Sequence, residues 1–127
     1  MIVVDSSVFV AIFKDEAEAV SISQRLALAK RRAMSAGTYL ECAIVAESRF
    51  GGRVELDAWL VRRSVEIHPV DYALAQLAAD AFARFGKGRH PAALNFGDCF
   101  AYALAKSLGA PLLFKGGDFA RTDLVAA

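Results

Sequence analysis

The sequence predicts an α/β fold in which a mainly parallel sheet of four or five strands is covered by helices on both faces. Short apolar segments recur along the chain, and most are followed by a longer segment with apolar residues at helical spacing. The chain has 127 residues, of which 56% are hydrophobic and 23% are charged, so it can bury one sizeable core. We therefore expect a single domain over residues 1–127, without an internal repeat or linker.

The first half of the chain is expected to contain two strands and four helices. Residues 2–5 form an apolar, β-branched run that ends in Asp5, which is typical of a short buried strand. A helix over residues 6–13 follows, with Asp5, Ser6 or Ser7 as its cap. The remaining elements are a helix over 15–32, a strand over 33–36, a helix from Thr38 to about Phe50, and a helix over 54–63. The helix that begins at Thr38 opens with a capping-box pattern that ends at Glu41.

The second half continues the alternation. Residues 65–70 predict a strand closed by proline, and residues 72–85 a helix capped by Asp71. A basic loop over 86–93 leads into a helix that is almost entirely apolar until Lys106 and should therefore be buried on most sides. Residues 112–114 predict a further strand, and residues 122–125 a last edge strand.

Composition narrows the class of protein. No apolar run approaches the roughly 18 residues that a membrane-spanning helix needs, and the N-terminus lacks the basic region of a signal peptide, so we expect a cytoplasmic protein. The net charge of +1 gives no strong overall field for nucleic acid, although basic residues gather in three clusters. Cys42 and Cys99 are too few and too widely spaced for a disulfide framework or a zinc motif, and we expect buried thiols.

Four carboxylates each interrupt an apolar context near a predicted strand end or helix start, and these are Asp5, Glu41, Asp98 and Asp118. Each has an ordinary explanation as a helix cap, a capping-box residue or a turn residue. Ligands of parallel α/β sheets bind just outside the carboxyl ends of the strands, however, and several buried carboxylates in one place require a cation. Mg²⁺ suits such oxygen ligands, with Mn²⁺ as a substitute. Spacing alone leaves both explanations open.

Several segments resemble the PIN-domain family, and within it the VapC-type toxins of bacterial toxin–antitoxin modules. The similarity rests on the opening Ile2–Ser7, on Glu41, on the segment Lys87–Ala105 with its Asn-Phe-Gly-Asp core, and on the ending Leu112–Leu124. The resemblance implies a three-layer α/β/α sandwich, Mg²⁺-dependent endoribonuclease activity and inhibition by a cognate VapB-type antitoxin. It also implies a homodimer, and we expect the helices of residues 37–63 to offer contact surfaces to a second copy or to an antitoxin helix.

The same resemblance assigns roles to individual residues. Asp5 and Asp98 are expected to be the principal metal ligands, with Glu41 and Asp118 as further catalytic acids and ligands. Asp123 is expected to assist these acids. The basic clusters by themselves predict RNA contacts through phosphates, chiefly from Lys87, Arg89 and Lys115. Ser6, Thr38 and Asn95 have two explanations, as residues that hold metal ligands or phosphate oxygens and as plain helix caps. Gly117 stands where a polar residue is expected, which leaves the substrate contact there undefined.

The chemistry expected of this set is hydrolysis of a phosphodiester by metal-activated water, leaving a 5′-phosphate and a 3′-hydroxyl. Single-stranded or loop RNA is the expected substrate, because its bases can be splayed out. Two alternatives keep the same fold: a Mg²⁺-dependent DNA nuclease or phosphatase, and a non-catalytic module that binds RNA or protein. The four acids do not encode the choice of substrate.

Overall fold

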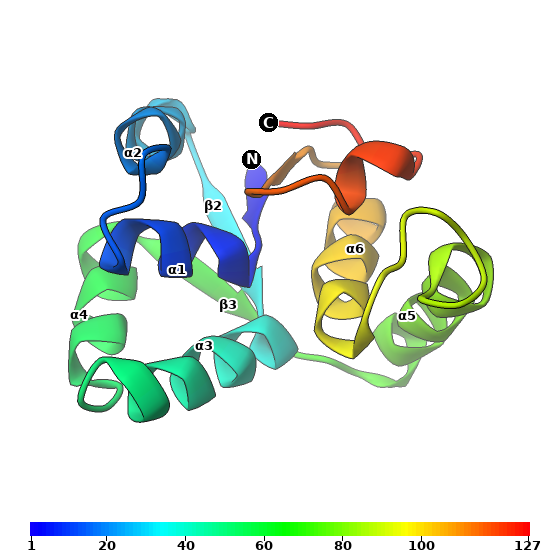
Figure 1. Ribbon diagram of the computed structural model, residues 1–127, viewed down its shortest axis with the longest axis horizontal. Helices are drawn as coiled ribbons and strands as arrows, with labels where there is room; N and C mark the ends of the chain where they lie inside the picture. Colours follow the sequence, from blue (N-terminus) through cyan, green and yellow to red (C-terminus); the bar gives the residue numbers. More distant parts are fainter.

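The computed structural model describes residues 1–127 and contains one parallel four-stranded sheet with the order β3-β2-β1-β4 (Figure 1). The strands are β1 (Ile2–Val4), β2 (Arg32–Ser35), β3 (Val65–His68) and β4 (Leu112–Leu113). The helices are α1 (Ser6–Phe13), α2 (Ala19–Leu28), α3 (Ala36–Arg49), α4 (Val54–Arg62), α5 (Tyr72–Phe85), α6 (Phe96–Leu108) and the 3₁₀ helix η1 (Phe119–Arg121).

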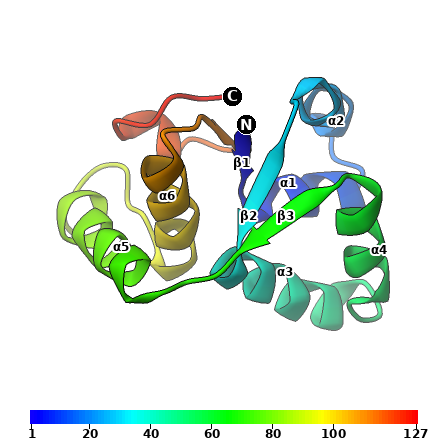
Figure 2. The ribbon, with the colours of Figure 1, turned by 180° about the vertical axis from the view of Figure 1, so that it is seen from behind.

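The sheet separates two hydrophobic cores. Successive residues of a strand point to opposite faces, and accordingly Val4 and Met34 pack with α1–α4, whereas Val3 and Ala33 pack with α5 and α6. Figure 2 shows α5 and α6 on one side of the sheet and the other four helices on the opposite side. This arrangement confirms the predicted α/β/α sandwich.

The central strand brings three chain segments to one edge of the sheet. β1 lies between β2 and β4 and is parallel to both, so all three strands end on the same side. Asp5 follows β1 directly, Ser35 ends β2, and the segment leading to Asp118 follows β4. Chain ends of this kind are where parallel α/β sheets form ligand sites.

The third helix approaches the sixth closely because two glycines leave room. A Cβ atom on Gly37 of α3 would lie 2.5 Å from the Phe100 ring of α6, and a Cβ atom on Gly97 of α6 would lie 2.2 Å from the Glu41 carboxylate of α3. A side chain at Gly37 would therefore push the Phe100 ring and its helix away, whereas a side chain at Gly97 would displace the end of Glu41.

The helix predicted over residues 15–32 is shorter than expected. α2 covers only Ala19–Leu28, and Arg32 begins β2 instead. The Arg32 guanidinium donates hydrogen bonds to the carbonyl oxygens of Leu26 (2.6 Å) and Ala27 (3.2 Å), which satisfies acceptors that the end of the helix leaves free.

Two further expectations were wrong. α3 begins at Ala36, with Ser35 as its N-cap accepting a hydrogen bond from the Gly37 amide (3.2 Å), so Thr38 and Glu41 do not form a capping box. The fifth strand is reduced to an isolated bridge between Leu112 and Ala126, because the chain after β4 turns through η1 first. Strands over 65–70 and 112–114 are shortened by one or two residues.

The two cysteines are buried free thiols, as expected. No helix has both the length and the apolar character needed to cross a membrane.

Candidate metal centre

Asp5 performs two tasks with its two carboxylate oxygens. Oδ2 accepts a hydrogen bond from the Ser7 amide (3.0 Å) and so caps α1, whereas Oδ1 is buried without any partner. The residue is only 3% exposed. Burial raises the pKa of the Asp5 carboxyl, and the nearby charge of Asp118 adds to the rise, although hydrogen bonds from Ser7 and Ser6 oppose it. The unpartnered oxygen leaves this acid able to bind a cation while it caps the helix.

Glu41 reaches the same space from the second turn of α3. Its Oε1 is buried without a partner, and Thr38 Oγ1, one turn earlier, is also buried and unpartnered. Burial raises the pKa of Glu41, the Ser6 hydroxyl opposes the rise, and the Asp5 charge adds to it. Unsatisfied buried oxygens are costly, and all three side-chain oxygens of this kind in the protein belong to Asp5, Thr38 and Glu41.

Asp98 approaches from the first turn of α6, where it forms a capping box with Asn95. The Asp98 amide donates to Asn95 Oδ1 (2.9 Å), and the Asn95 amide donates to Asp98 Oδ2 (3.0 Å). Burial raises the pKa of Asp98 to about 7; the Asn95 amide opposes this, and the charges of Asp5, Asp118 and Glu41 increase it. Such a raised pKa is typical of a carboxyl that lies among other acids and lacks a nearby basic partner.

Asp118 completes the group from the loop after β4. It is exposed, makes no capping hydrogen bond to η1, and acts on Asp5 and Asp98 through its charge. The structure thus gathers the four predicted acids at one edge of the sheet. No three of their side chains come close enough to hold one metal ion together, so a shared ion requires these side chains to turn toward one another.

The donor set fits a hard divalent cation. It offers carboxylate oxygens and a hydroxyl, and Asp5 Oδ1 and Glu41 Oε1 are buried oxygens that a cation would satisfy. The thiol of Cys42 is not a candidate ligand, because burial and the charges of Asp5 and Glu41 raise its pKa far above its ordinary value.

The protein without metal is expected to become more stable as the pH falls from 8 to 5. The folded-state pKa of Asp98 lies above its unfolded-state value of 3.8, so the folded protein binds the extra proton and stability falls as the pH rises through about 7. Asp5 and Glu41 shift in the same direction. After discounting for partial exposure, the effect is about 1 kcal/mol, or a midpoint roughly 3–6 °C higher at pH 5 in thermal unfolding.

Two further melts make this prediction specific. Asp98→Asn should flatten the pH dependence, because asparagine does not titrate and retains the cap. Mg²⁺ added at pH 8 should raise the midpoint by stabilising the folded state that binds it. A midpoint that rises from pH 5 to pH 8 without metal would contradict the proposed electrostatic repulsion.

The other predicted polar residues fall into two groups. Asn95 exchanges hydrogen bonds with Asp98, Ser6 follows Asp5 directly, and Thr38 lies one turn before Glu41 on α3. Asp123 instead accepts hydrogen bonds from Tyr102 (2.6 Å) and Lys106 (3.0 Å) farther along α6, and lies 3.4 Å from Arg84. These contacts tie the C-terminal segment to α5 and α6, so the structure does not bring Asp123 to the acids.

The three basic residues that were expected to contact RNA differ in whether they have an ion-pair partner. The Lys115 ammonium forms ion pairs with Glu16 and with Glu18 (3.5 Å). Lys115 was expected to contact phosphate, but these two glutamates already neutralise its charge. Lys87 and Arg89, in the loop before α6, are exposed and form no ion pair. Both are therefore cations without an ion-pair partner in the loop before α6.

Sequence reasoning missed two residues that shape the site. The Ser7 hydroxyl accepts a hydrogen bond from the Lys115 amide (2.9 Å) and so holds the loop after β4 against α1. Gly97 admits the Glu41 carboxylate against α6. In the sequence, the serine pair after Asp5 and the glycine directly before Asp98 could have indicated these roles. Serine and glycine at such positions are also typical of ordinary helix caps and turns.

Comparison with known proteins identifies the family. A model of the PIN domain matches residues 2–125. Ribonuclease VapC of Mycolicibacterium smegmatis is 53% identical over 126 residues, covering 98% of each chain, and ribonuclease VapC30 of Mycobacterium tuberculosis is 48% identical over 124 residues, covering 96% of this chain and 95% of that protein. The chain belongs to the PIN-domain family. Within it, the chain is a member of the VapC ribonucleases, the toxins of toxin–antitoxin systems, as the resemblance implied.

Two solved structures share the fold over the full chain. Mycobacterium tuberculosis VapC20, described as a toxin that cleaves the sarcin–ricin loop, superimposes with a TM-score of 0.78 at 22% identity and covers 100% of this chain and 98% of that one. A toxin–antitoxin complex from Klebsiella pneumoniae gives a TM-score of 0.74 at 17% identity, with coverage of 100% and 97%. At these identities the likeness establishes the fold alone. PIN-domain VapC nucleases are generally metal-dependent, which agrees with the donor set described above.

Proposed function

We propose that the protein is a Mg²⁺-dependent endoribonuclease that hydrolyses RNA at the acid cluster of Asp5, Glu41, Asp98 and Asp118. The observation that carries this proposal is the pair of buried, unpartnered carboxylate oxygens, Asp5 Oδ1 and Glu41 Oε1, beside a third acid whose pKa is raised to about 7. A folded protein keeps such costly groups together when they bind a ligand that compensates them.

Each acid has a part in this chemistry. Asp5 and Asp98 would hold the Mg²⁺ ion, with Glu41 and Asp118 as additional ligands; Mn²⁺ would serve in its place. When bound, the cation lowers the pKa of a coordinated water and neutralises charge on the phosphate. Glu41 or Asp118 orients the attacking water, and Asn95 keeps Asp98 in place through the capping box. Attack by water at phosphorus releases a 5′-phosphate and a 3′-hydroxyl.

His90 takes no part in this mechanism. Its Nδ1 accepts a hydrogen bond from the Ala92 amide (3.0 Å), and its ring packs edge-on against Phe85 with 5.0 Å between centroids. These contacts fix the loop before α6.

A cleavage assay tests the function. The purified protein should cut an unstructured RNA oligonucleotide with Mg²⁺ and not with excess chelator, and the products should carry 5′-phosphates. DNA of the same sequence should remain intact. Equal cleavage with and without chelator, or products with 2′,3′-cyclic ends, would contradict hydrolysis by metal-activated water.

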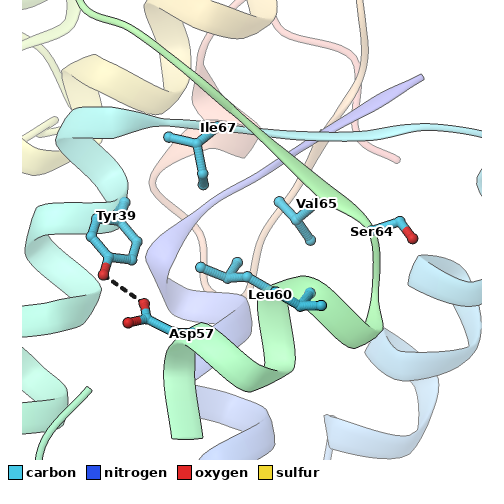
Figure 3. Close-up of a pocket in the computed structure, with 7 residues that line it drawn as sticks. Tyr39, Asp57, Leu60, Ser64, Val65 and Ile67 are labelled. Carbon is cyan, nitrogen blue, oxygen red and sulfur yellow. Dashed lines mark hydrogen bonds between the residues drawn. The ribbon is translucent and has the colours of Figure 1, made fainter. Parts of the chain in front are cut away.

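We further propose that a VapB-type antitoxin binds the exposed apolar surface of α3 and α4. Leu40 and Ile44 are each 59% exposed and lie one turn apart on α3, and Val61 of α4 is 78% exposed. Between these helices and β3 lies a hollow whose wall includes Leu60 and a hydrogen bond from the Tyr39 hydroxyl to Asp57 (2.6 Å; Figure 3). An amphipathic antitoxin helix matches such a surface, and so does a second copy in a homodimer.

Ile44→Asp should abolish protection by the antitoxin without affecting the nuclease. A charge on this apolar surface opposes the docking of an apolar helix face. Expression of the protein should slow bacterial growth, co-expression of the antitoxin should restore it, and Ile44→Asp should prevent this rescue while RNA cleavage in vitro stays unchanged. Growth curves report all three results.

Val20→Asp is the matched control, because Val20 is 68% exposed on α2, outside this surface. It should remain rescuable. If Ile44→Asp is rescued as fully as Val20→Asp, the antitoxin binds elsewhere. Sedimentation of the wild type and of Ile44→Asp would show whether the same surface holds a second copy.

A further inference from the structure

A wholly apolar groove runs between α5 and α6, next to the acid cluster. Its volume is about 540 Å³, and its walls are alanines and Phe82 from α5 with Phe96, Cys99 and Phe100 from α6. The two helices lie side by side in both views of the ribbon (Figures 1 and 2). The groove and the acid cluster share one helix turn, because Phe96 and Cys99 flank the position of Asp98.

Phe96 is the unusual residue of this groove. It is the first residue of α6 and is 79% exposed, although burying a phenyl ring is strongly favourable. Its ring meets Phe100 edge-on, with 5.1 Å between centroids, which leaves one ring available to a flat partner. An exposed aromatic ring contributes little to folding, so a ligand better explains its place two residues before Asp98.

The charges at the rim indicate the chemistry of that ligand. The Arg89 guanidinium lies 5.8 Å from the centre of the Phe82 ring, which forms part of the groove wall. Lys87 is exposed two residues before it, and neither side chain has a carboxylate partner. An apolar groove lined by aromatic rings, with unpaired cations beside it, matches an unpaired nucleobase and its phosphate.

We propose that this groove is a base-stacking subsite for single-stranded RNA. Phe96 stacks on the base of a nucleotide beside the cleaved bond, and Arg89 and Lys87 contact the backbone phosphates. The subsite rests on the proposed ribonuclease function and deepens it, because it explains how an unpaired strand is aligned with the acids. Phe96 is thus a substrate-binding residue, whereas Cys99 and the alanines only line the groove.

The test combines protein variants with modified RNA. Binding is measured without metal in chelator, and cleavage with Mg²⁺, using an unstructured oligonucleotide and copies that lack one base at successive positions around the cut. Phe96→Ala should weaken binding of the intact RNA roughly 5- to 100-fold. Removing the stacked base should weaken wild-type binding similarly, and should have little further effect on Phe96→Ala. Phe96→Tyr should retain binding, and Phe96→Leu, which is apolar but not aromatic, should not.

Val54→Ala is the matched control, since Val54 is 78% exposed at the first position of α4 and lies outside the groove. It should bind RNA as the wild type does. Full binding by Phe96→Leu would overturn the proposal, because apolar area rather than stacking would then be responsible. The proposal would also be overturned if the binding loss from Phe96→Ala added fully to the loss from each missing base. If Phe96→Ala then also sedimented as a monomer while the wild type did not, the groove would be an interface between copies. Wild-type cleavage of the intact RNA separates these results from a failure of the ribonuclease function itself.

Discussion

Asp5→Asn is expected to lower the rate of RNA cleavage at least about 100-fold while leaving the fold intact. Loss of residues that merely support metal ligands costs about 10- to 100-fold, and a ligand should cost no less. Asparagine caps helices as well as aspartate does, so α1 keeps its cap and only the anionic Oδ1 is lost. Burial raises the pKa of the Asp5 carboxyl, which means that its negative charge is unfavourable in the folded protein. The thermal midpoint should therefore be unchanged or higher, because an amide carries no charge.

Asp71→Asn is the control for this substitution. Asp71 also caps a helix, through a hydrogen bond from the Leu74 amide (2.8 Å), but it lies outside the acid cluster. Its cleavage rate should equal that of the wild type. Equal cleavage by Asp5→Asn and the wild type would reject the metal mechanism and leave capping as the only role of Asp5.

Gly97→Ala is expected to lower cleavage about 10- to 100-fold with little change in stability. The new Cβ atom would lie 2.2 Å from Glu41 Oε2, so the carboxylate must move away from α6. A displacement of about 1 Å in a catalytic group can cost on the order of 100-fold in rate. Folding should tolerate the change, because the end of a glutamate side chain can shift and alanine favours the helix.

The role of Glu41 in this effect can be isolated. Gly97→Ala should add little to the loss caused by Glu41→Gln, since both act on one carboxylate. Gly117→Ala is the matched control, because a Cβ atom there meets nothing within 4 Å. Full activity of Gly97→Ala would mean that the position of Glu41 does not matter for cleavage.

The fold was predictable because its signals are local, whereas residue spacing named the four acids but left open whether they meet. Apolar periodicity located every strand of the sheet and each of the longer helices. Asp5 stands directly at a strand end, Glu41 and Asp98 stand in early helix turns, and Asp118 lies in the loop after β4. Errors arose where a distant contact overrode a local pattern. Arg32 leaves the predicted helix because its guanidinium binds the end of α2 from the neighbouring strand. Thr38 and Glu41 match a capping box, yet Ser35 caps α3 because β2 ends there.

The roles of individual charged residues depended on three-dimensional contacts. Lys115 and Asp123 resembled site residues in the sequence, but Lys115 pairs with Glu16 across 99 positions, and Asp123 binds Tyr102 and Lys106. No pattern of residue types reveals such partners, because side chains compete for them only after the layers have packed.

Asp5 shows how the two kinds of information combine. Its position after a buried strand made it a candidate for both a cap and a ligand, since the order of residues fixes the backbone path and places acids at one edge of the sheet. Only packing assigned Oδ2 to the Ser7 amide and buried Oδ1 without a partner. That division depends on the α3–α6 approach and the loop after β4, and therefore on distances that a linear chain does not contain.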